Sequence, residues 1–249
     1  MIHIAETLGV GTIESFLTDT ERTHLAKLTA DVLTPETGAR FAQERRTSIH
    51  EIPGHTPEQA MNIYEPAGRI EIPTIPDEAE KILQGAFDRA RPALSRAFPS
   101  ITTCRPWTYV EYGPGQHITP HLDGIAPDPL AWPRQIAGIS VVIGQAEAGG
   151  EFFVETCGSE HLWNRQPPTP AEHGYAAGIW FAHDGADNSS AWFQQMPRTR
   201  WSAAPAPGTA LVYGSQLAHG TAPVTSGRCA KFISWLIADD HAPAPTSGR

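Results

Sequence analysis

The chain lacks any run of about 20 apolar residues, so it offers no transmembrane helix. Its amino terminus, Met1-Ile-His-Ile-Ala-Glu6, also lacks the charged start and apolar stretch of a signal peptide. We therefore expect a cytoplasmic protein with no membrane partner. The three cysteines, Cys104, Cys157 and Cys229, form no Cys-x-x-Cys pair, which fits reduced thiols buried as small apolar side chains.

Positive charge is scarce as well. The chain has 18 Lys and Arg against 27 Asp and Glu, which gives a net charge of −9 at pH 7 with neutral His. Because binding to a phosphate backbone requires a basic face, this composition argues against a nucleic-acid partner. The 249 residues can bury a substantial core, and we expect one domain. The 23 Pro and 22 Gly indicate a loop-rich β protein.

Helical signals are found in the first part of the chain. Residues 18–21, Thr-Asp-Thr-Glu, form a capping box that predicts a helix to about Leu33. Residues 56–59, Thr-Pro-Glu-Gln, can start a short helix, and a longer amphipathic helix is expected from Pro76. The rest of residues 34–75 shows no sustained periodicity, so we interpret it as irregular cover.

From residue 107 onward the pattern changes to short extended runs separated by turns. This predicts an α+β fold that is mainly β, with a jelly-roll (double-stranded β-helix) core backed by helices. We expect helical support over residues 1–104, the core over 105–238, a lid-like insertion at about 156–206 and a tail over 239–249. The predicted strands are Trp107–Tyr112, His117–Leu122, Gln135–Ile143, Gly150–Glu155, Thr209–Tyr213 and Cys229–Ile237.

A candidate metal site begins with His121-Leu122-Asp123. On an extended strand, residues 121 and 123 share a face, so both side chains point the same way. His219 lies far downstream, in an expected loop between two strands. Two imidazoles and one carboxylate can bind one face of a ferrous ion and leave coordination positions open. The alternative for the isolated triplet is a strand histidine that is hydrogen-bonded to a neighbour.

Two further residues flank these candidate ligands in the sequence. Arg228 follows His219 by nine residues and could return beside the metal on the last strand; alternatively it forms a surface salt bridge. Tyr112 precedes a Gly/Pro turn, where an aromatic side chain also commonly plugs a core. Lys231 is on the opposite parity from Arg228, and we expect it to be solvated.

This order of motifs resembles the iron(II)- and 2-oxoglutarate-dependent oxygenases, and it is most similar to their prolyl-hydroxylase-like branch. The resemblance covers roughly residues 105–238. It rests on Tyr112 with the following turn, His121-x-Asp123, Gly149-Gly-Glu-Phe-Phe153, His219, Pro223-Val224 and Gly227-Arg228.

The resemblance implies a catalytic centre in which His121, Asp123 and His219 hold iron(II), while Arg228 and Tyr112 bind 2-oxoglutarate. The implied cofactors are iron(II), 2-oxoglutarate and O2, with ascorbate as an aid in vitro. The implied reaction is hydroxylation of an unactivated C–H bond with release of succinate and CO2. In related halogenases a small residue replaces the carboxylate, so Asp123 makes hydroxylation the default. Desaturation and ring closure use the same three ligands and stay open.

For the substrate we expect a small, amino-acid-like molecule. Alternatives that stay open are a protein or peptide hydroxylase of the prolyl type and a non-catalytic metal-binding jelly-roll module. A nucleic-acid repair oxygenase is disfavoured by the acidity of the chain. The sequence does not determine the oligomeric state. The candidate substrate contacts are Trp132, Arg134, His117 and Arg165, for which surface charge or a solvated turn is the alternative interpretation.

Overall fold

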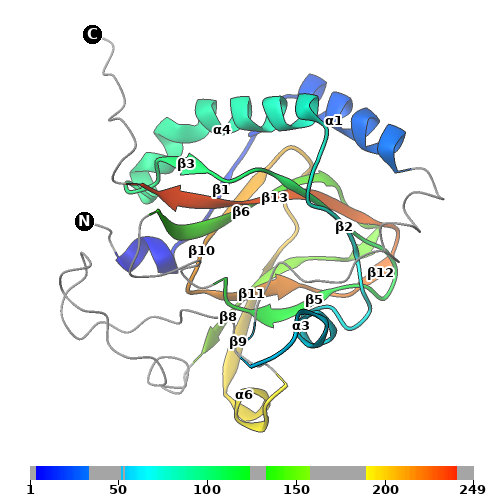
Figure 1. Cartoon of the computed structure of the whole chain (residues 1–249), viewed down its shortest axis with the longest axis vertical. Helices are drawn as coiled ribbons and strands as arrows, with labels where there is room; N and C mark the ends of the chain where they lie inside the picture. Colours follow the sequence, from blue (N-terminus) through cyan, green and yellow to red (C-terminus); the bar gives the residue numbers. More distant parts are fainter. Residues whose placement is uncertain (1–3, 34–51, 53, 124–132, 158–188, 240–249) are drawn as a thin grey trace.

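A computed structural model describes residues 4–33, 52, 54–123, 133–157 and 189–239. Two antiparallel sheets face each other, and two long helices cover the outer side of the larger sheet (Figure 1). The larger sheet runs in the order β1 (Val10–Ile13), β10 (Ala210–Gly214), β6 (Arg134–Gly144), β13 (Cys229–Ala238), β4 (Thr108–Tyr112) and β2 (Ile70–Ile72), with β3 (Thr103–Cys104) also pairing with β13.

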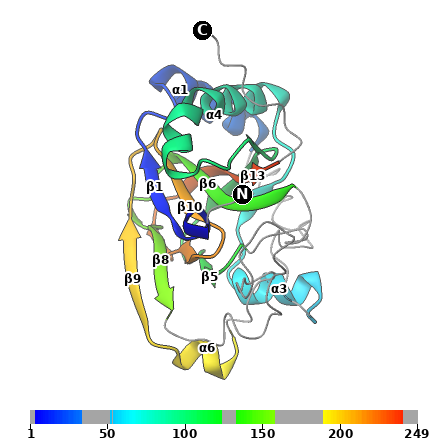
Figure 2. The same cartoon turned by 90° about the vertical axis from the view of Figure 1, so that its left-hand side faces the viewer.

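The smaller sheet has four strands, and two further strands form a separate pair. This architecture confirms the predicted jelly roll with helical support. In Figure 2 the strands β8 and β9 lie side by side, with α6 next to the end of the pair. The smaller sheet runs in the order β5 (Ile118–His121), β11 (Ala218–Thr221), β8 (Phe152–Cys157) and β9 (Arg198–Ala203), and the separate pair is β12 (Val224–Ser226) with β7 (Ala148–Gly149).

The predicted helices form with the expected caps. Thr18 and Thr56 each accept a hydrogen bond from the backbone three residues later, and both capping boxes are complete. The long helix runs through Pro92. The helices are η1 (Ile4–Leu8, a 3-10 turn), α1 (Asp19–Val32), α3 (Pro57–Tyr64), α4 (Asp77–Ala97) and α6 (Ala191–Gln195).

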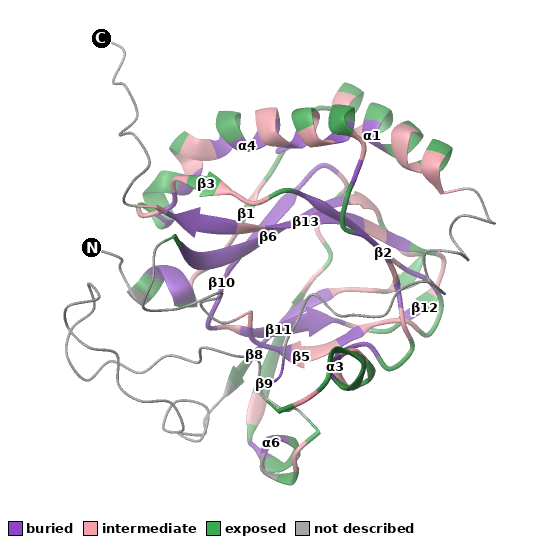
Figure 3. Ribbon diagram, in the orientation of Figure 1, coloured by how far each residue is buried: buried purple, intermediate pink, exposed green. Residues whose placement is uncertain are grey.

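Alternation along the large sheet divides its side chains between two environments. One set packs against α1 and α4 in the main core, and the polar outer surfaces of these helices remain exposed (Figure 3). The other set points into the space between the two sheets, where the candidate site lies. Core members from the outward set include Tyr109, Ile139, Val141, Val212, Phe232 and Leu236.

All six predicted strands are present, with ends that shift by a few residues. The expectation that His219 lies in a loop is wrong, because His219 belongs to β11. Residues 34–75, interpreted as irregular cover, contain β2, and the stretch 156–206 contains β9. The first strand has only three residues and the second is mostly polar, so their pairing partners determine their conformation more than their composition does. In the described part of the chain, no helix is long and apolar enough to cross a membrane.

Candidate metal centre

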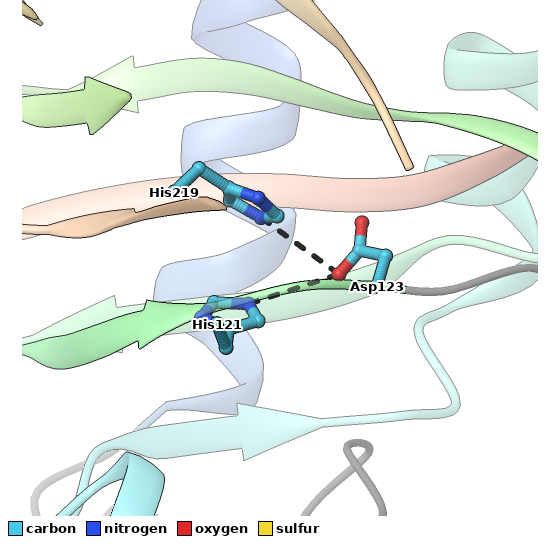
Figure 4. Close-up of side chains that lie close together, drawn as sticks. All are labelled: His121, Asp123 and His219. Atoms are coloured by element: carbon cyan, nitrogen blue, oxygen red, sulfur yellow. Dashed lines mark ion pairs between the residues drawn. The ribbon is translucent and has the colours of Figure 1, made fainter. Parts of the chain in front are cut away.

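The three predicted ligands meet between the sheets. His121 and His219 are direct partners in the register of β5 and β11, so their side chains leave the sheet on the same face. Asp123 follows two residues after His121 and points to the same place (Figure 4). Its Oδ1 atom lies 3.7 Å from Nε2 of His121 and 3.7 Å from Nε2 of His219. One ligand atom from each residue lies within 4.8 Å of the others.

The backbone fixes which imidazole nitrogen faces this point. His121 Nδ1 lies 2.8 Å from the carbonyl oxygen of Thr119, and His219 Nδ1 lies 2.9 Å from that of Leu217. A carbonyl oxygen can only accept, so each Nδ1 must carry the proton. In its neutral form, each imidazole therefore presents the lone pair of Nε2 toward Asp123. This orientation of metal-binding histidines by a second hydrogen bond is common in metal sites.

The donor set fits a divalent ion. A separation of 3.7 Å is too long for a hydrogen bond. Two atoms that each lie about 2.1 Å from a shared ion are at most about 4.2 Å apart, so these separations suit binding of one metal ion by all three residues. Burial raises the pKa of Asp123, although the nearby His219 opposes this shift. A cation between the three groups would favour the charged carboxylate.

Aromatic rings hold both imidazoles in place. The ring of Tyr64 lies 5.5 Å from that of His121, and the ring of Tyr213 lies 4.3 Å from that of His219. Burial raises the pKa of Tyr213 well above its usual value, so its hydroxyl stays protonated. Gly138 makes room for this ring, since a Cβ there would come within 2.4 Å of it. The ligand side chains are therefore confined before any metal binds.

A cavity beside the three ligands contains a buried cation. Lys231 is 6% exposed, and its Nζ donates to the hydroxyl of Thr221 at 2.7 Å. The same Nζ lies 5.0 Å from the centre of the Tyr112 ring. Among the described residues, no carboxylate pairs with Lys231. The hydroxyl of Ser140, which is also buried in the lining, has no hydrogen-bond partner there.

Arg228 lies outside this cavity. Its side chain is 64% exposed, and its guanidinium pairs with Glu111. The residue precedes β13, whose inward positions are those of Cys229, Lys231 and Ile233. The expectation that Lys231 is solvated is therefore wrong. The two residues do have opposite parity, but Lys231 is the one that points inward.

The two other candidates that the structure describes, His117 and Arg134, do not line the cavity of the metal ligands. His117 lies in the turn before β5, with its Nδ1 3.1 Å from the carbonyl oxygen of Gly115. Arg134 is the first residue of β6 and is fully buried, so it is not a surface charge, but it does not line the cavity. Trp132 and Arg165 lie outside the described residues. The role of each in substrate binding stays a prediction.

Sequence reasoning did not identify two cations at this site. The inward position of Lys231 could have been predicted, because on the last strand it alternates in step with other residues that line the cavity, such as Ile233. Arg69 carried none, since it precedes a short strand in an aperiodic segment. It nevertheless lines the same cavity as Tyr112 and Lys231.

Comparison with known proteins was made with both the sequence and the structure. No protein-family model matches the sequence, and no curated protein matches it either. Solved structures do match. A viral collagen prolyl hydroxylase from Paramecium Bursaria Chlorella virus-1, in a 2OG complex, is 15% identical with a TM-score of 0.52, and the match covers 95% of this chain and 99% of that one.

Two further matches are prolyl hydroxylases as well. One is from Trichoplax adhaerens, in complex with a peptide fragment of a hypoxia inducible factor oxygen degradation domain; it is 13% identical with a TM-score of 0.53, over 92% of this chain and 84% of that one. The other is a prolyl-4-hydroxylase from Pseudomonas putida, 15% identical with a TM-score of 0.50, over 92% of both chains. At these identities the likeness shows that the chain shares their fold.

Proposed function

We propose that the protein is an iron(II)- and 2-oxoglutarate-dependent oxygenase. One observation carries the proposal. The Nε2 atoms of His121 and His219 converge with the carboxylate of Asp123 next to a buried ammonium, Lys231, which has no carboxylate partner among the described residues. A metal with open positions beside an unmatched cation suits a small acid that chelates the metal and carries a second negative charge.

The three ligands have a defined part in this function. His121, Asp123 and His219 would hold the metal on one face, with the Nε2 atom of each imidazole turned toward it by the backbone acceptor at Nδ1. Iron(II) bound there supplies the oxygen chemistry that couples decarboxylation of 2-oxoglutarate to oxidation of a C–H bond. The surrounding rings exclude water from the ligands and limit their motion.

Lys231 is our candidate for the residue that binds the far carboxylate of 2-oxoglutarate. It takes the role that the sequence suggested for Arg228, whose side chain points to Glu111. Thr221 accepts a hydrogen bond from Lys231, so its own hydroxyl proton remains available to an anion. Tyr112 lines the same cavity and supplies a phenol. Buried charge-assisted hydrogen bonds of this kind are stronger than neutral ones.

We propose hydroxylation of a small, amino-acid-like substrate as the reaction, with release of succinate and CO2. The carboxylate of Asp123 occupies the position that a halide would need, which favours hydroxylation. A peptide substrate is the rival, and it is supported by the peptide in the complex of the Trichoplax prolyl hydroxylase. The assay must therefore include both substrate classes.

The test is turnover of anaerobically purified protein loaded with iron(II). The protein receives 2-oxoglutarate and a panel of free amino acids, simple derivatives and proline-containing peptides, and oxygen is then admitted. Succinate and new masses are followed together. Asp123→Ala and His219→Ala serve as metal-site variants, and Arg89→Lys, on the exposed face of α4, serves as the matched surface control.

Substrate-dependent succinate together with the gain of one oxygen atom would establish the function and identify the substrate class. Slow succinate formation without any substrate, abolished in both metal-site variants, would support the oxygenase and place its substrate outside the panel. Metal binding without any succinate would instead favour the non-catalytic module.

A further inference from the structure

Arg69 reaches the cavity from outside the jelly-roll core. It directly precedes β2, the edge strand that pairs with β4, and it follows α3 by a short turn. Its guanidinium is buried and lines the cavity with Tyr112 and Lys231. An arginine buried this deeply must be held by partners, because removing its charge from water is costly.

Three partners fix the guanidinium from different sides. Arg69 Nη2 donates to Glu71 Oε2 at 2.6 Å and lies 3.3 Å from Glu65 Oε1, while Nε lies 3.2 Å from the same Glu71 oxygen. Arg69 Nη1 donates to the hydroxyl oxygen of Tyr112 at 2.6 Å. The guanidinium is rigid and planar, so bonds to the two carboxylates also determine where Nη1 points.

The hydrogen bond between Arg69 and Tyr112 can run in one direction only. A guanidinium can only donate, so the phenol oxygen of Tyr112 accepts from Arg69. The phenol has one proton of its own, and among the described residues it donates that proton to none. The proton is therefore available to a ligand in the cavity. A donor that already accepts a bond from a cation is also a stronger donor, because the two bonds polarise each other.

We propose that Arg69 is a positioning residue of the cosubstrate site: it orients the Tyr112 hydroxyl as a hydrogen-bond donor to the far carboxylate of a 2-oxo dicarboxylic acid. The inference rests on the proposed function and adds a residue to it. Lys231 binds the carboxylate by charge, and Tyr112 adds a directed hydrogen bond that depends on Arg69. The carboxylates of Glu65 and Glu71 offset the charge of Arg69 and keep it on the phenol.

The segment that carries Arg69 also contacts a metal ligand. Tyr64, the last residue of α3, packs on His121, and the hydroxyl of Thr119 on β5 donates to the backbone carbonyl groups of Ile63 and Tyr64. The stretch from α3 to β2 therefore touches both halves of the site. The segment therefore does more than cover the core, because it contacts both His121 and Tyr112.

The test measures binding of two 2-oxo acids to manganese(II)-loaded protein by calorimetry. One is 2-oxoglutarate, and the other is 2-oxovalerate, which has the same five-carbon chain without the far carboxylate. The proteins are wild type, Arg69→Lys, Tyr112→Phe and the double variant, with Arg89→Lys as the control for an exposed arginine paired with a glutamate. Melting temperature and manganese(II) affinity are measured for each protein.

We expect Arg69→Lys and Tyr112→Phe each to weaken 2-oxoglutarate binding about tenfold, as for loss of a hydrogen bond to a charged group. The double variant should bind no more weakly than Tyr112→Phe alone, because Arg69 acts through the phenol. Binding of 2-oxovalerate and of manganese(II) should stay within about twofold of wild type. A merely structural arginine would weaken both acids alike.

Unchanged 2-oxoglutarate affinity in Arg69→Lys would overturn the inference, as would a roughly hundredfold loss in the double variant, which would mean that the two residues act independently. If Arg69→Lys unfolds, the double variant Arg69→Lys with Glu65→Gln takes its place in the same comparison. The second substitution removes the charge of a buried carboxylate that has lost its guanidinium partner. Absence of 2-oxoglutarate binding to wild-type protein that does bind manganese(II) would instead contradict the proposed function itself.

Discussion

Two basic side chains near the start of β13 point in opposite directions. Lys231 is buried with its Nζ on Thr221, and Arg228 is exposed with its guanidinium on Glu111. Sequence spacing suggested the reverse: it placed the start of the last strand correctly at Cys229, but it took Arg228, and not Lys231, as the basic residue that returns beside the metal. The start of β13 at Cys229 leaves Arg228 in the preceding turn. A one-residue shift in a strand moves a side chain to the other face of the sheet.

Substitution of these two residues separates their roles. We expect Lys231→Met to weaken binding of 2-oxoglutarate to metal-loaded protein by about 10- to 100-fold, because a buried charge-assisted partner is lost. Arg228→Met should change the affinity less than about twofold, since exposed ion pairs contribute little. Calorimetric titration of both variants measures this difference. A larger loss in Arg228→Met than in Lys231→Met would reverse the assignment.

The thiol of Cys104 should react slowly in the folded protein. Burial raises its pKa to about 12, and the carboxylates of Glu80 and Asp88 add to the shift. At pH 8 roughly one thiol in 10,000 is then ionised, and the thiolate is the reactive form. We expect alkylation of Cys104 by iodoacetamide to be at least about 100-fold slower in native than in urea-unfolded protein, as measured by mass spectrometry of its peptide.

The same shift has a defined effect on stability. In the unfolded chain the thiol ionises near its ordinary value of 9.0, whereas in the folded protein it remains neutral until about 12. Its contribution is therefore complete below pH 9 and is lost as the pH rises toward 12. Equal alkylation rates in native and unfolded protein at pH 8 would show that Cys104 is not shielded as described.

At the scale of the element, β5 and β11 determine the metal site. The first was predicted from alternation, and the second was not, because Ala218-His-Gly-Thr221 is too short and too polar to indicate a strand. Its conformation comes from pairing on both sides, with β5 and with β8. The conformation of β2 likewise comes from pairing, since this strand has only three residues and, among the described strands, pairs with β4. Short strands depend on partners that are distant in sequence, so a local pattern cannot reveal them.

Gly220 sets the distance between β11 and β5. A Cβ at this position would lie 2.5 Å from the ring of Phe153 and 2.6 Å from the carbonyl oxygen of Ile118. We expect Gly220→Ala to destabilise the protein by about 1–3 kcal/mol, because the strands must move apart. Metal affinity should also fall, since the move separates His219 from His121. Thermal melting and manganese(II) titration measure the two effects.

Gly11 on β1 offers a matched control. A Cβ there meets no atom within 4 Å, so Gly11→Ala should leave both stability and metal affinity nearly unchanged. Unaltered metal affinity in Gly220→Ala, despite a lower melting temperature, would show that the positions of the two histidines do not depend on the spacing of these strands.

For the whole molecule, the jelly roll, the α1 and α4 cover and the three candidate metal ligands were all predictable. The fold follows from local signals, namely capping boxes, an amphipathic helix and alternation. The ligand set also depended on the order of motifs along the chain, which added His219 to the pair His121 and Asp123. Apart from Tyr112, the surroundings of these residues were not predicted. Arg69, Tyr213 and Lys231 meet there through sheet pairing and packing of segments far apart in sequence. Such contacts depend on the complete fold. The candidate metal ligands, in contrast, can also be recognised from their spacing in the sequence, His121-x-Asp123 followed by His219.

Metal binding should stabilise the entire fold, because the ligands lie on two neighbouring strands of the smaller sheet and on the residue after one of them. A ligand that binds only the native state at about 100 times its dissociation constant adds about 2.7 kcal/mol. For a chain of 249 residues this corresponds to a rise in melting temperature of about 5–10 °C. Manganese(II) is a suitable probe, since it accepts the same nitrogen and oxygen ligands without being oxidised readily.

We expect this rise in wild-type protein and its reversal by EDTA, as measured by calorimetric melting at pH 7.5. His219→Ala should melt near the metal-free wild type and should gain less than about 2 °C from manganese(II), because two ligands hold the ion weakly. The gain should shrink on acidification, since protons compete with the metal for Asp123, whose pKa is raised by burial. An equal gain in His219→Ala and wild type would place the bound ion elsewhere and remove the basis of the proposed function.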